Sequence, residues 1–416
     1  MKKTTVIALV IVGAAAARAV PIVEDVTLVQ SEATRKVKVS YKLKGEPAIV
    51  TVDFLTNGVS IGEANFTSVY GDVNRFIAPS GETERRIFWQ PDRDWAGHSV
   101  SGMTAVVSAW CTNAPPEYLD IQLGTTYPLV KRYYVSKDAV PGGITNVLYK
   151  TTHLLMRKCP AAGREWSMGA RPTDCAGDKP ALHRVVLSSD FYIGVYEYTL
   201  KQWKAMGGST DRLYFLNIED ADICPAAGLA FENICGTGRT WPLSTDALGS
   251  SSVMYKLASA SGLKIDLPTE AQWEFACRAG CEASLYDGTE YVDVYSVTNL
   301  AWTSNNSGGT THPVGLKKPN AWDLYDMLGN VEEHCLDWEY PSAAYEGIPS
   351  DGAAMFDPVG PDAATNNRRM MRGGCYFAGG DLSRPCSRYR ISTVNNYTST
   401  AGALGFRVCC PAVIPE

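Results

Sequence analysis

Hydrophobic and polar residues alternate along much of the first hundred positions of the chain. The alternating runs are short, and turn-forming residues follow them, for example at 45–47 and 56–58. A period of two predicts half-buried strands, and short strands with frequent turns are typical of a sandwich. We therefore predict an all-β sandwich over 20–111, immunoglobulin-like or fibronectin-III-like. Its expected strands lie around Val26 and Leu28 and at 37–43, 49–54, 86–89 and 104–110.

Proline and glycine interrupt this pattern between 112 and 150. Pro115-Pro116 opens the stretch and Gly142-Gly143 lies near its end, with a few β-prone residues between them. This composition predicts a linker over 112–150 that carries a strand or two. We place the boundary of the next domain near residue 150.

The third region, 151–416, is rich in loops, Trp, Gly and Asn, and it has few helical patterns. The strongest helix signal covers 269–278, where Thr269 is a plausible N-cap and Gly280 a plausible C-cap. Two more helices are expected at 200–206 and 251–261. So few helices in so long a region predict an irregular α+β domain.

The N-terminus has the pattern of a signal peptide. Two lysines precede an apolar stretch at 6–17, and Ala17-Arg18-Ala19 forms a small-x-small cleavage site. The alternative is a membrane anchor, but the stretch is shorter than the roughly 20 residues that span a bilayer. We expect residues 1–19 to be removed after Ala19, and the protein to be secreted or to lie in the periplasm or cell envelope, with no later transmembrane segment.

Charge and histidine content exclude two classes of function. The chain has 38 Lys+Arg against 44 Asp+Glu, so its net charge of −6 disfavours nucleic acid as a partner. The 5 histidines include no pair three to five residues apart, which excludes a helical His-x-x-x-His zinc site.

The expected export favours disulfides among the 12 cysteines, because thiols outside the cytosol tend to be oxidised. Adjacent Cys409 and Cys410 are expected to pair with different partners. The candidates for local disulfides, on sequence separation alone, are Cys224 with Cys235, Cys277 with Cys281, and Cys375 with Cys386.

Several strings of the third region resemble the formylglycine-generating enzyme (sulfatase-modifying factor) family. They are FYIGVYEYTLKQW at 191–203, LPTEAQWEFACRAG at 267–280, HPVGLKKPNAWDLYDMLGNVEE at 312–333, RMMRGGCYF at 369–377 and GALGFRV at 402–408. The resemblance covers the chain from about residue 150 to its end. It implies an elaborated C-type-lectin-like fold.

The same resemblance implies an oxidase only where its copper-binding cysteines are present. In the oxidising members two thiolates bind Cu(I) at the second and seventh positions after the aromatic residue of the Arg-Gly-Gly motif, which are Ala378 and Ser383 here. Copper is therefore doubtful. One alternative is that Cys375 and Cys386 form a displaced redox pair and that the chain still oxidises a protein cysteine, for example in a sulfatase. The other is that they form a disulfide or are two unrelated thiols.

Calcium is the cofactor that the resemblance favours. The family's second calcium site corresponds to the side chains of Asp326 and Glu333 and the backbone carbonyls of Gly329 and Val331. Carboxylate and carbonyl oxygens are ligands that Ca²⁺ prefers. The alternative is a loop that Asp and Glu stabilise without an ion. We expect the neighbouring Glu332 and His334 to be solvent-exposed rather than catalytic.

Arginine and tyrosine follow the missing thiols and make a composition suited to binding. We expect an exported module that binds a protein, peptide or glycan; a purely structural envelope protein is a further alternative. Arg384 and Arg388 could instead pair with core carboxylates. The candidate ligand-binding residues are Tyr376, Arg384, Arg388, Tyr389, Arg390, Asn396 and Tyr397.

Overall fold

The computed structural model describes residues 4–5, 8–11, 20–124, 126–170, 181–211, 213–214, 218–339, 348–362, 368–392 and 401–413. The chain divides into two compact units. The first unit contains 1–120, 131–146 and 412–416, and the second contains 121–130 and 147–411. Asn396 and Tyr397 and most of the expected signal peptide lie outside the described residues, as does the side chain of Arg390.

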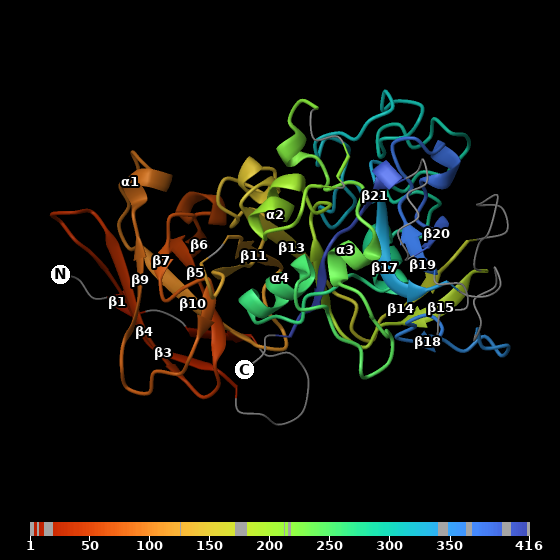
Figure 1. Ribbon diagram of the computed structural model, residues 1–416. Helices are drawn as coiled ribbons and strands as arrows, with labels where there is room; N and C mark the ends of the chain where they lie inside the picture. The colour runs from red at the N-terminus through yellow and green to blue at the C-terminus, as the bar shows by residue number, and fades with distance from the viewer. Residues whose placement is uncertain are drawn as a thin grey trace. The chain divides into compact units, whose positions relative to one another are not determined.

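The first unit consists mainly of two sheets that share one core (Figure 1). Phe54 from one sheet stacks on Trp89 from the other, with ring centroids 4.5 Å apart. One sheet has the order β1(Thr4–Thr5), β3(Ile22–Gln30), β4(Val37–Lys44), β9(Arg85–Trp89), β7(Tyr70–Gly71). The other has the order β2(Ala8–Ile11), β10(Thr104–Cys111), β5(Ala48–Thr56), β6(Val59–Ser60), with β8(Arg75–Ile77) also on β5. The only helical turns described in 20–111 are η1(Glu63–Phe66) and α1(Pro91–Asp94).

All five predicted strands of this region are present as β3, β4, β5, β9 and β10. The immunoglobulin-like or fibronectin-III-like topology stays a prediction. Two strands fall inside the expected signal peptide, because β1 pairs with β3 and β2 pairs in parallel with β10. The stretch expected as a linker carries β11(Tyr118–Gln122) and β12(Lys131–Tyr134), which pair with each other.

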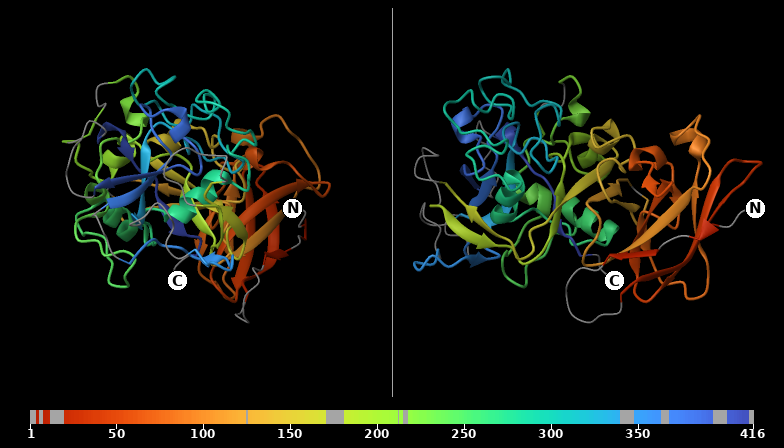
Figure 2. Two further views of the ribbon diagram at one scale, coloured as in Figure 1. Left: turned by 90° about the vertical axis from the view of Figure 1, so that its right-hand side faces the viewer. Right: turned by 180° about the vertical axis from the view of Figure 1, so that it is seen from behind.

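The second unit has three groups of strands and a few short helices (Figure 2). The first group is β13(His153–Cys159), β16(Phe191–Gly194) and β22(Cys409–Pro411); the second is β14(Glu165–Met168), β15(His183–Val186) and β18(Met355–Phe356). The third is a sheet in the order β20(Arg388–Ser392), β19(Arg368–Arg372), β17(Glu332–Trp338), β21(Leu404–Gly405). The helices are α2(Leu200–Ala205), α3(Phe231–Cys235), α4(Val253–Ser261) and α5(Glu270–Arg278), and the 3-10 turns are η2(Val147–Lys150), η3(Ala221–Ile223), η4(Gly380–Leu382) and η5(Ala401–Ala403).

Helix α5 begins as its sequence predicts. The Thr269 hydroxyl accepts a hydrogen bond from the backbone N–H of Gln272, and the Gln272 side chain accepts one from the Thr269 N–H. This reciprocal capping box satisfies two donors that a helix start otherwise leaves unpaired. The C-cap is Ala279 in the left-handed region, one residue before the predicted Gly280. Helices α2 and α4 confirm the other two predicted helices within two residues at each end. None of the described helices is long and apolar enough to cross a bilayer.

The predicted local disulfides are wrong. Cys224, Cys235, Cys277, Cys281 and Cys375 are all free thiols. The Cys277 thiol points at the Met327 carbonyl and the Cys281 thiol at the Leu285 carbonyl, so closeness in sequence does not bring these two sulfurs together. Cys386 is disulfide-bonded. Its partner is not Cys375.

Candidate functional site

The loop after β19 is the segment in which the family resemblance places the copper-binding cysteines. It starts at Gly373 and Gly374, whose φ angles of +97° and +74° favour glycine. Cys375 follows and is completely buried. Its thiol lies 3.7 Å from the Glu332 carboxylate at the start of β17. The turn therefore places one sulfur against one carboxylate inside the protein.

Burial keeps both of these groups protonated more strongly than in water. It raises the pKa of Glu332 to about 7, while the hydrogen bond from Cys375 opposes this shift. Burial, and next the Glu332 charge, raises the pKa of the Cys375 thiol well above its ordinary value. A thiolate is the form that binds copper or attacks a substrate. Cys375 is therefore a poorly reactive thiol at neutral pH.

The two positions that correspond to the family's thiols contain no sulfur. Ala378 packs with Cys375, Tyr376 and Ala403 in a small apolar cluster. Ser383 is fully buried, and its hydroxyl has no hydrogen-bond partner among the described residues. Neither side chain can supply a soft metal ligand.

Three of the predicted ligand-binding residues come near this cluster. Tyr376 is mostly buried beside Cys375. The Tyr389 hydroxyl is buried with no hydrogen-bond partner among the described residues, and burial, then the charges of Glu332 and Cys375, raise its pKa. Arg384 donates to the Asp381 carbonyl and lies 4.3 Å from the ring centroid of Tyr291. The tyrosines and the Cys375–Glu332 pair thus form one buried polar group.

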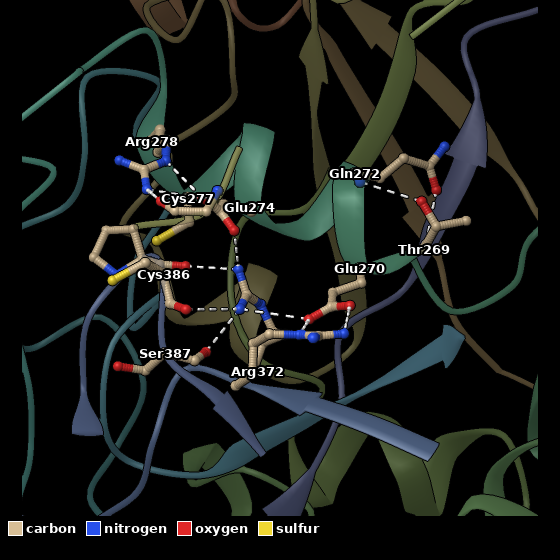
Figure 3. Close-up of polar contacts among 12 residues, drawn as sticks. Thr269, Glu270, Gln272, Glu274, Cys277, Arg278, Arg372, Cys386 and Ser387 are labelled. Atoms are coloured by element: carbon tan, nitrogen blue, oxygen red, sulfur yellow. Dashed lines mark hydrogen bonds and ion pairs between the residues drawn. The ribbon is translucent and has the colours of Figure 1, made fainter. Parts of the chain in front are cut away.

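Arg388 points elsewhere, as one alternative from the sequence anticipated. Its guanidinium pairs with Glu270 at the start of α5, at 2.7 Å from Nη2 to Oε2. Figure 3 shows the neighbouring buried network, in which Arg372 bonds Glu274 and the backbone carbonyls of Cys386 and Ser387. The network fastens α5 to β19 and β20. It leaves Arg388 unavailable for a ligand.

One of the expected calcium ligands, Glu333, is part of a buried ion pair with Arg407. Both oxygens of Glu333 accept hydrogen bonds from Arg407 at 2.6 Å, and Trp273 Nε1 donates to one of them at 2.7 Å. Asp326 Oδ2 accepts the Gly315 N–H at 2.6 Å, and Oδ1 is buried with no partner among the described residues. Burial raises the pKa of Asp326 to about 6. Of the two expected carboxylate ligands, only Asp326 therefore has an oxygen without a hydrogen-bond partner among the described residues.

Sequence reasoning missed Glu197 and Arg407, the two residues that complete this group. The Glu197 carboxylate is fully buried and accepts hydrogen bonds from Asn330 Nδ2 at 2.7 Å and from the Val331 N–H at 3.0 Å. Arg407 lies in the GALGFRV string and Glu197 in FYIGVYEYTLKQW. Two charged residues inside apolar strings were the available signal of a buried pair or network.

The prediction that Glu332 and His334 are solvent-exposed is wrong. Both lie on β17, a central strand of its sheet, and His334 is completely buried. His334 Nε2 bonds the Leu229 carbonyl, and burial lowers the pKa of its imidazole to about 4. A neutral imidazole that holds a backbone carbonyl is a structural group.

The sulfatase-modifying factor enzyme 1-like domain family matches residues 161–411, which is more than half of the chain. The chain belongs to this family. It is 34% identical over 152 residues to a formylglycine-generating enzyme of Thermomonospora curvata, over 34% of this chain and 48% of that protein. It is 28% identical over 291 residues to a serine/threonine-protein kinase pkn1 of Chlamydia pneumoniae, over 67% of this chain and 40% of that protein. The chain thus spans less than half the length of these two relatives.

Two solved structures align with part of this chain. The Treponema denticola variable protein 1 aligns with a TM-score of 0.47 and 24% identity, over 62% of this chain and 95% of that chain. PvdO from Pseudomonas aeruginosa aligns with a TM-score of 0.47 and 22% identity, over 62% of this chain and 94% of that one.

Neither metal that the family resemblance implies fits the side chains of this chain. A copper site needs two nearby thiolates, whereas Ala378 and Ser383 have no sulfur and Cys386 is already in a disulfide. A calcium site of the expected type needs the Glu333 carboxylate, whose oxygens are taken by Arg407 and Trp273. Among the described residues, His, Cys, Asp and Glu side chains form no group of three that could hold a metal.

Proposed function

We propose that this member of the sulfatase-modifying factor family is an exported binding protein and not an oxidase. One observation carries the proposal. The positions that would bear the copper thiols are Ala378 and Ser383, while the nearby Cys386 is disulfide-bonded and Cys375 is buried against Glu332. Oxidation by copper and O₂ requires a pair of thiolates, and these positions do not supply one.

The binding face of the proposal is the surface above the Cys375–Glu332 pair. Phe377, which is 38% exposed, lies on it, next to the buried Tyr376 and with the half-buried Tyr389 in the same part of the chain. Tyrosine provides a large contact area and a hydroxyl, a combination enriched at protein interfaces. The Tyr389 hydroxyl is buried and has no partner in the described residues, so it becomes a donor for a ligand only when the side chains over it move apart.

Anaerobic titration with Cu(I) separates this proposal from the oxidase alternative. Fully reduced protein should show no tight stoichiometric thiolate binding, and it should consume no O₂ when a cysteine-containing peptide is added. Tight copper binding with O₂ uptake that a Cys375→Ser or Cys386→Ser variant removes would establish an oxidase and overturn the proposal.

Peptide and glycan arrays test the binding function itself. A ligand of the proposed face should lose affinity in Tyr389→Phe, which removes only the hydroxyl, and in Phe377→Ala. Tyr70→Phe is the matched control, because Tyr70 is an exposed tyrosine of the first unit. Failure of every array probe would favour the structural alternative.

Export is the second component of the proposal, and the Ala17-Arg18-Ala19 site supports it. N-terminal sequencing of protein from the extracellular or periplasmic fraction should find Val20 as the first residue. Recovery of chains that begin at Met1 in the cytoplasm would contradict it. Cleavage would also remove β1 and β2 from the edges of the two sheets.

A further inference from the structure

Cleavage of the expected signal peptide would uncover one side of the first unit. On that side β3 of one sheet and β10 of the other lie next to each other. β1 pairs with β3 and β2 pairs with β10, and no other described strand pairs with these two edges. Both edges open only when the chain is cut after Ala19, so this inference rests on the export component of the proposed function.

The two edges differ in how far their sequences discourage further pairing. β3 carries Glu24 and Asp25, and its register with β4 shifts between Glu24 and Thr27. Charges and bulges are common protections of edge strands. β10 has neither, because its 8 residues TAVVSAWC include no charge and no proline and pair with β5 without a register shift. β10 is therefore an edge that can accept another strand.

The other edges of these two sheets offer much less backbone. β6 and β7 have 2 residues each, and β8 has 3. An added strand is stabilised by a row of N–H and C=O groups, so a longer edge gives more hydrogen bonds. Among the described strands of the sandwich, β10 thus combines a long edge with the absence of charge.

Residues 8–11 show which kind of chain fits β10. They run parallel to β10, with Leu9 opposite Ser108 and Val10 opposite Ala109. Their sequence, Ala-Leu-Val-Ile, is entirely apolar and includes two β-branched residues that favour strands. An apolar segment in extended conformation is therefore the class of occupant that this edge takes.

Cleavage would leave almost nothing before β3 to replace this segment, because the chain would start at Val20 and β3 starts at Ile22. The inward side chains of β10 include Val107 and Ala109, which belong to the core shared by the two sheets. Water can bond the uncovered N–H and C=O groups of β10, but it does not cover the adjacent apolar core favourably. A strand from another chain satisfies both.

We propose that the mature protein binds, along β10, an extended apolar strand of another exported protein. The strand runs parallel to β10 in the register of residues 8–11, and its alternate N–H groups donate to β10 carbonyls. Every second side chain of the strand points into the core beside Val107 and Ala109 and is therefore apolar. Backbone hydrogen bonds supply the affinity, and the core excludes charged segments.

Fluorescence anisotropy with a labelled peptide tests this proposal. The probe is a peptide of residues 2–11, in which Lys2 and Lys3 provide solubility. The protein is the exported chain, with Val20 confirmed as its first residue by mass spectrometry. This chain should bind the peptide saturably, whereas the uncleaved chain, whose own strand already pairs with β10, should not. A peptide with Leu9→Lys and Val10→Lys should not bind either protein.

Backbone methylation of the peptide separates strand pairing from general apolar contact. Alternate N–H groups of a strand point to opposite edges, so N-methylation at only one of Leu9 and Val10 removes a hydrogen bond to β10. One of the two methylated peptides should therefore bind about tenfold more weakly than the other. Equal affinities of the two peptides would overturn the proposal.

Disulfide cross-linking gives the direction of the bound strand. A peptide with Ile11→Cys should cross-link to Trp110→Cys, because Ile11 lies opposite Trp110 in the parallel register. An antiparallel strand with Leu9 opposite Ser108 would place the same cysteine beside Val106→Cys. The unsubstituted protein is the control for native thiols. Cross-linking to Val106→Cys instead of Trp110→Cys would overturn the proposed register.

Controls separate this site from the proposed function. Phe377→Ala and Tyr389→Phe should leave peptide binding unchanged, because neither residue belongs to the first unit. An exported chain that begins at Met1 would contradict the export component and leave β10 covered, which overturns both. A folded chain that begins at Val20 and binds no peptide would overturn this inference alone.

Discussion

Arg407 and Glu333 form a completely buried bidentate ion pair that links β17 to the segment before β22. Arg407 Nη2 lies 2.6 Å from Glu333 Oε1, and Arg407 Nε lies 2.6 Å from Oε2. The same guanidinium donates to the carbonyls of Gly194 and Tyr325. One arginine near the C-terminus therefore fixes β16, β17 and the loop before β17.

Removing one partner of this pair should destabilise the domain strongly. Arg407→Met leaves the Glu333 charge buried with only Trp273 as a donor, which should lower the free energy of unfolding by about 3–5 kcal/mol. Lys204→Met is the control, because its exposed pair with Asp222 contributes only about 0–1 kcal/mol. Urea unfolding of the two variants measures the difference. Equal losses of unfolding free energy in the two variants would show that burial of an ion pair does not increase the cost of breaking it.

Calcium should leave the stability of the domain unchanged. The sequence alone favours a calcium site, but Arg407 and Trp273 satisfy the Glu333 oxygens and only Asp326 Oδ1 is open. The melting temperature should therefore be the same in Ca²⁺ and in chelator, and metal analysis should find less than one calcium per chain. The opposite result would be one calcium per chain, with a rise in melting temperature that Asp326→Asn removes. It would show that the ligands expected from the family resemblance do bind calcium here.

Asp337 should make the domain less stable as the pH rises from about 4 to 7. Burial and the Glu270 charge raise the pKa of Asp337 from 3.8 to about 7. The folded state thus holds a proton that the unfolded state releases above pH 3.8, so stability is full below that pH and declines as pH approaches 7. Asp337→Asn cannot titrate and keeps an oxygen for the Glu270 N–H.

Unfolding of wild type and Asp337→Asn at several pH values measures this effect. Wild type should lose up to roughly 1.4 kcal/mol per pH unit relative to the variant within that window. The comparison of wild type with Asp222→Asn should give a slope of the opposite sign. The hydrogen bonds from Lys201 and Lys204 lower the pKa of Asp222, so wild type should gain stability relative to this variant as the pH rises. Parallel curves for wild type and Asp337→Asn would contradict the assignment.

Local patterns in the sequence predicted five strands of the first unit and the helices α2, α4 and α5 of the second. Strands such as β4 and β5 follow a period of two, and Thr269 marks the start of α5 because its capping box uses residues three apart. The family resemblance also placed Tyr376 and the missing thiols in one segment, with Tyr389 a few residues after it on β20. These features depend on neighbours in sequence or on an ordered set of motifs.

Features that depend on distant partners could not be predicted in this way. His334 and Glu332 look like surface residues, yet β17 is covered on both faces, and their partners are Leu229 and Cys375. Glu333 looks like a calcium ligand until Arg407 is seen 74 positions away. The prediction of cysteine pairs failed for the same reason, because thiols close in sequence, such as Cys277 and Cys281, point to different carbonyls.

Replacing Gly374 should destabilise the loop after β19. Its φ is +74°, and a Cβ there would collide with the Ser383 hydroxyl and lie 3.0 Å from the Leu382 carbonyl. Gly308 has a similar φ of +66° but has nothing within 4 Å of a Cβ position, so it reports the backbone cost alone. We expect Gly308→Ala to cost about 1 kcal/mol and Gly374→Ala to cost about 1–3 kcal/mol more, because its clash adds to the same strain. Thermal unfolding compares the two variants, and array binding of Gly374→Ala reports whether the loop has moved. Equal stability losses in the two variants would mean that the Ser383 side chain moves aside at no cost. The close contact between Gly374 and Ser383 would then not stabilise the loop after β19.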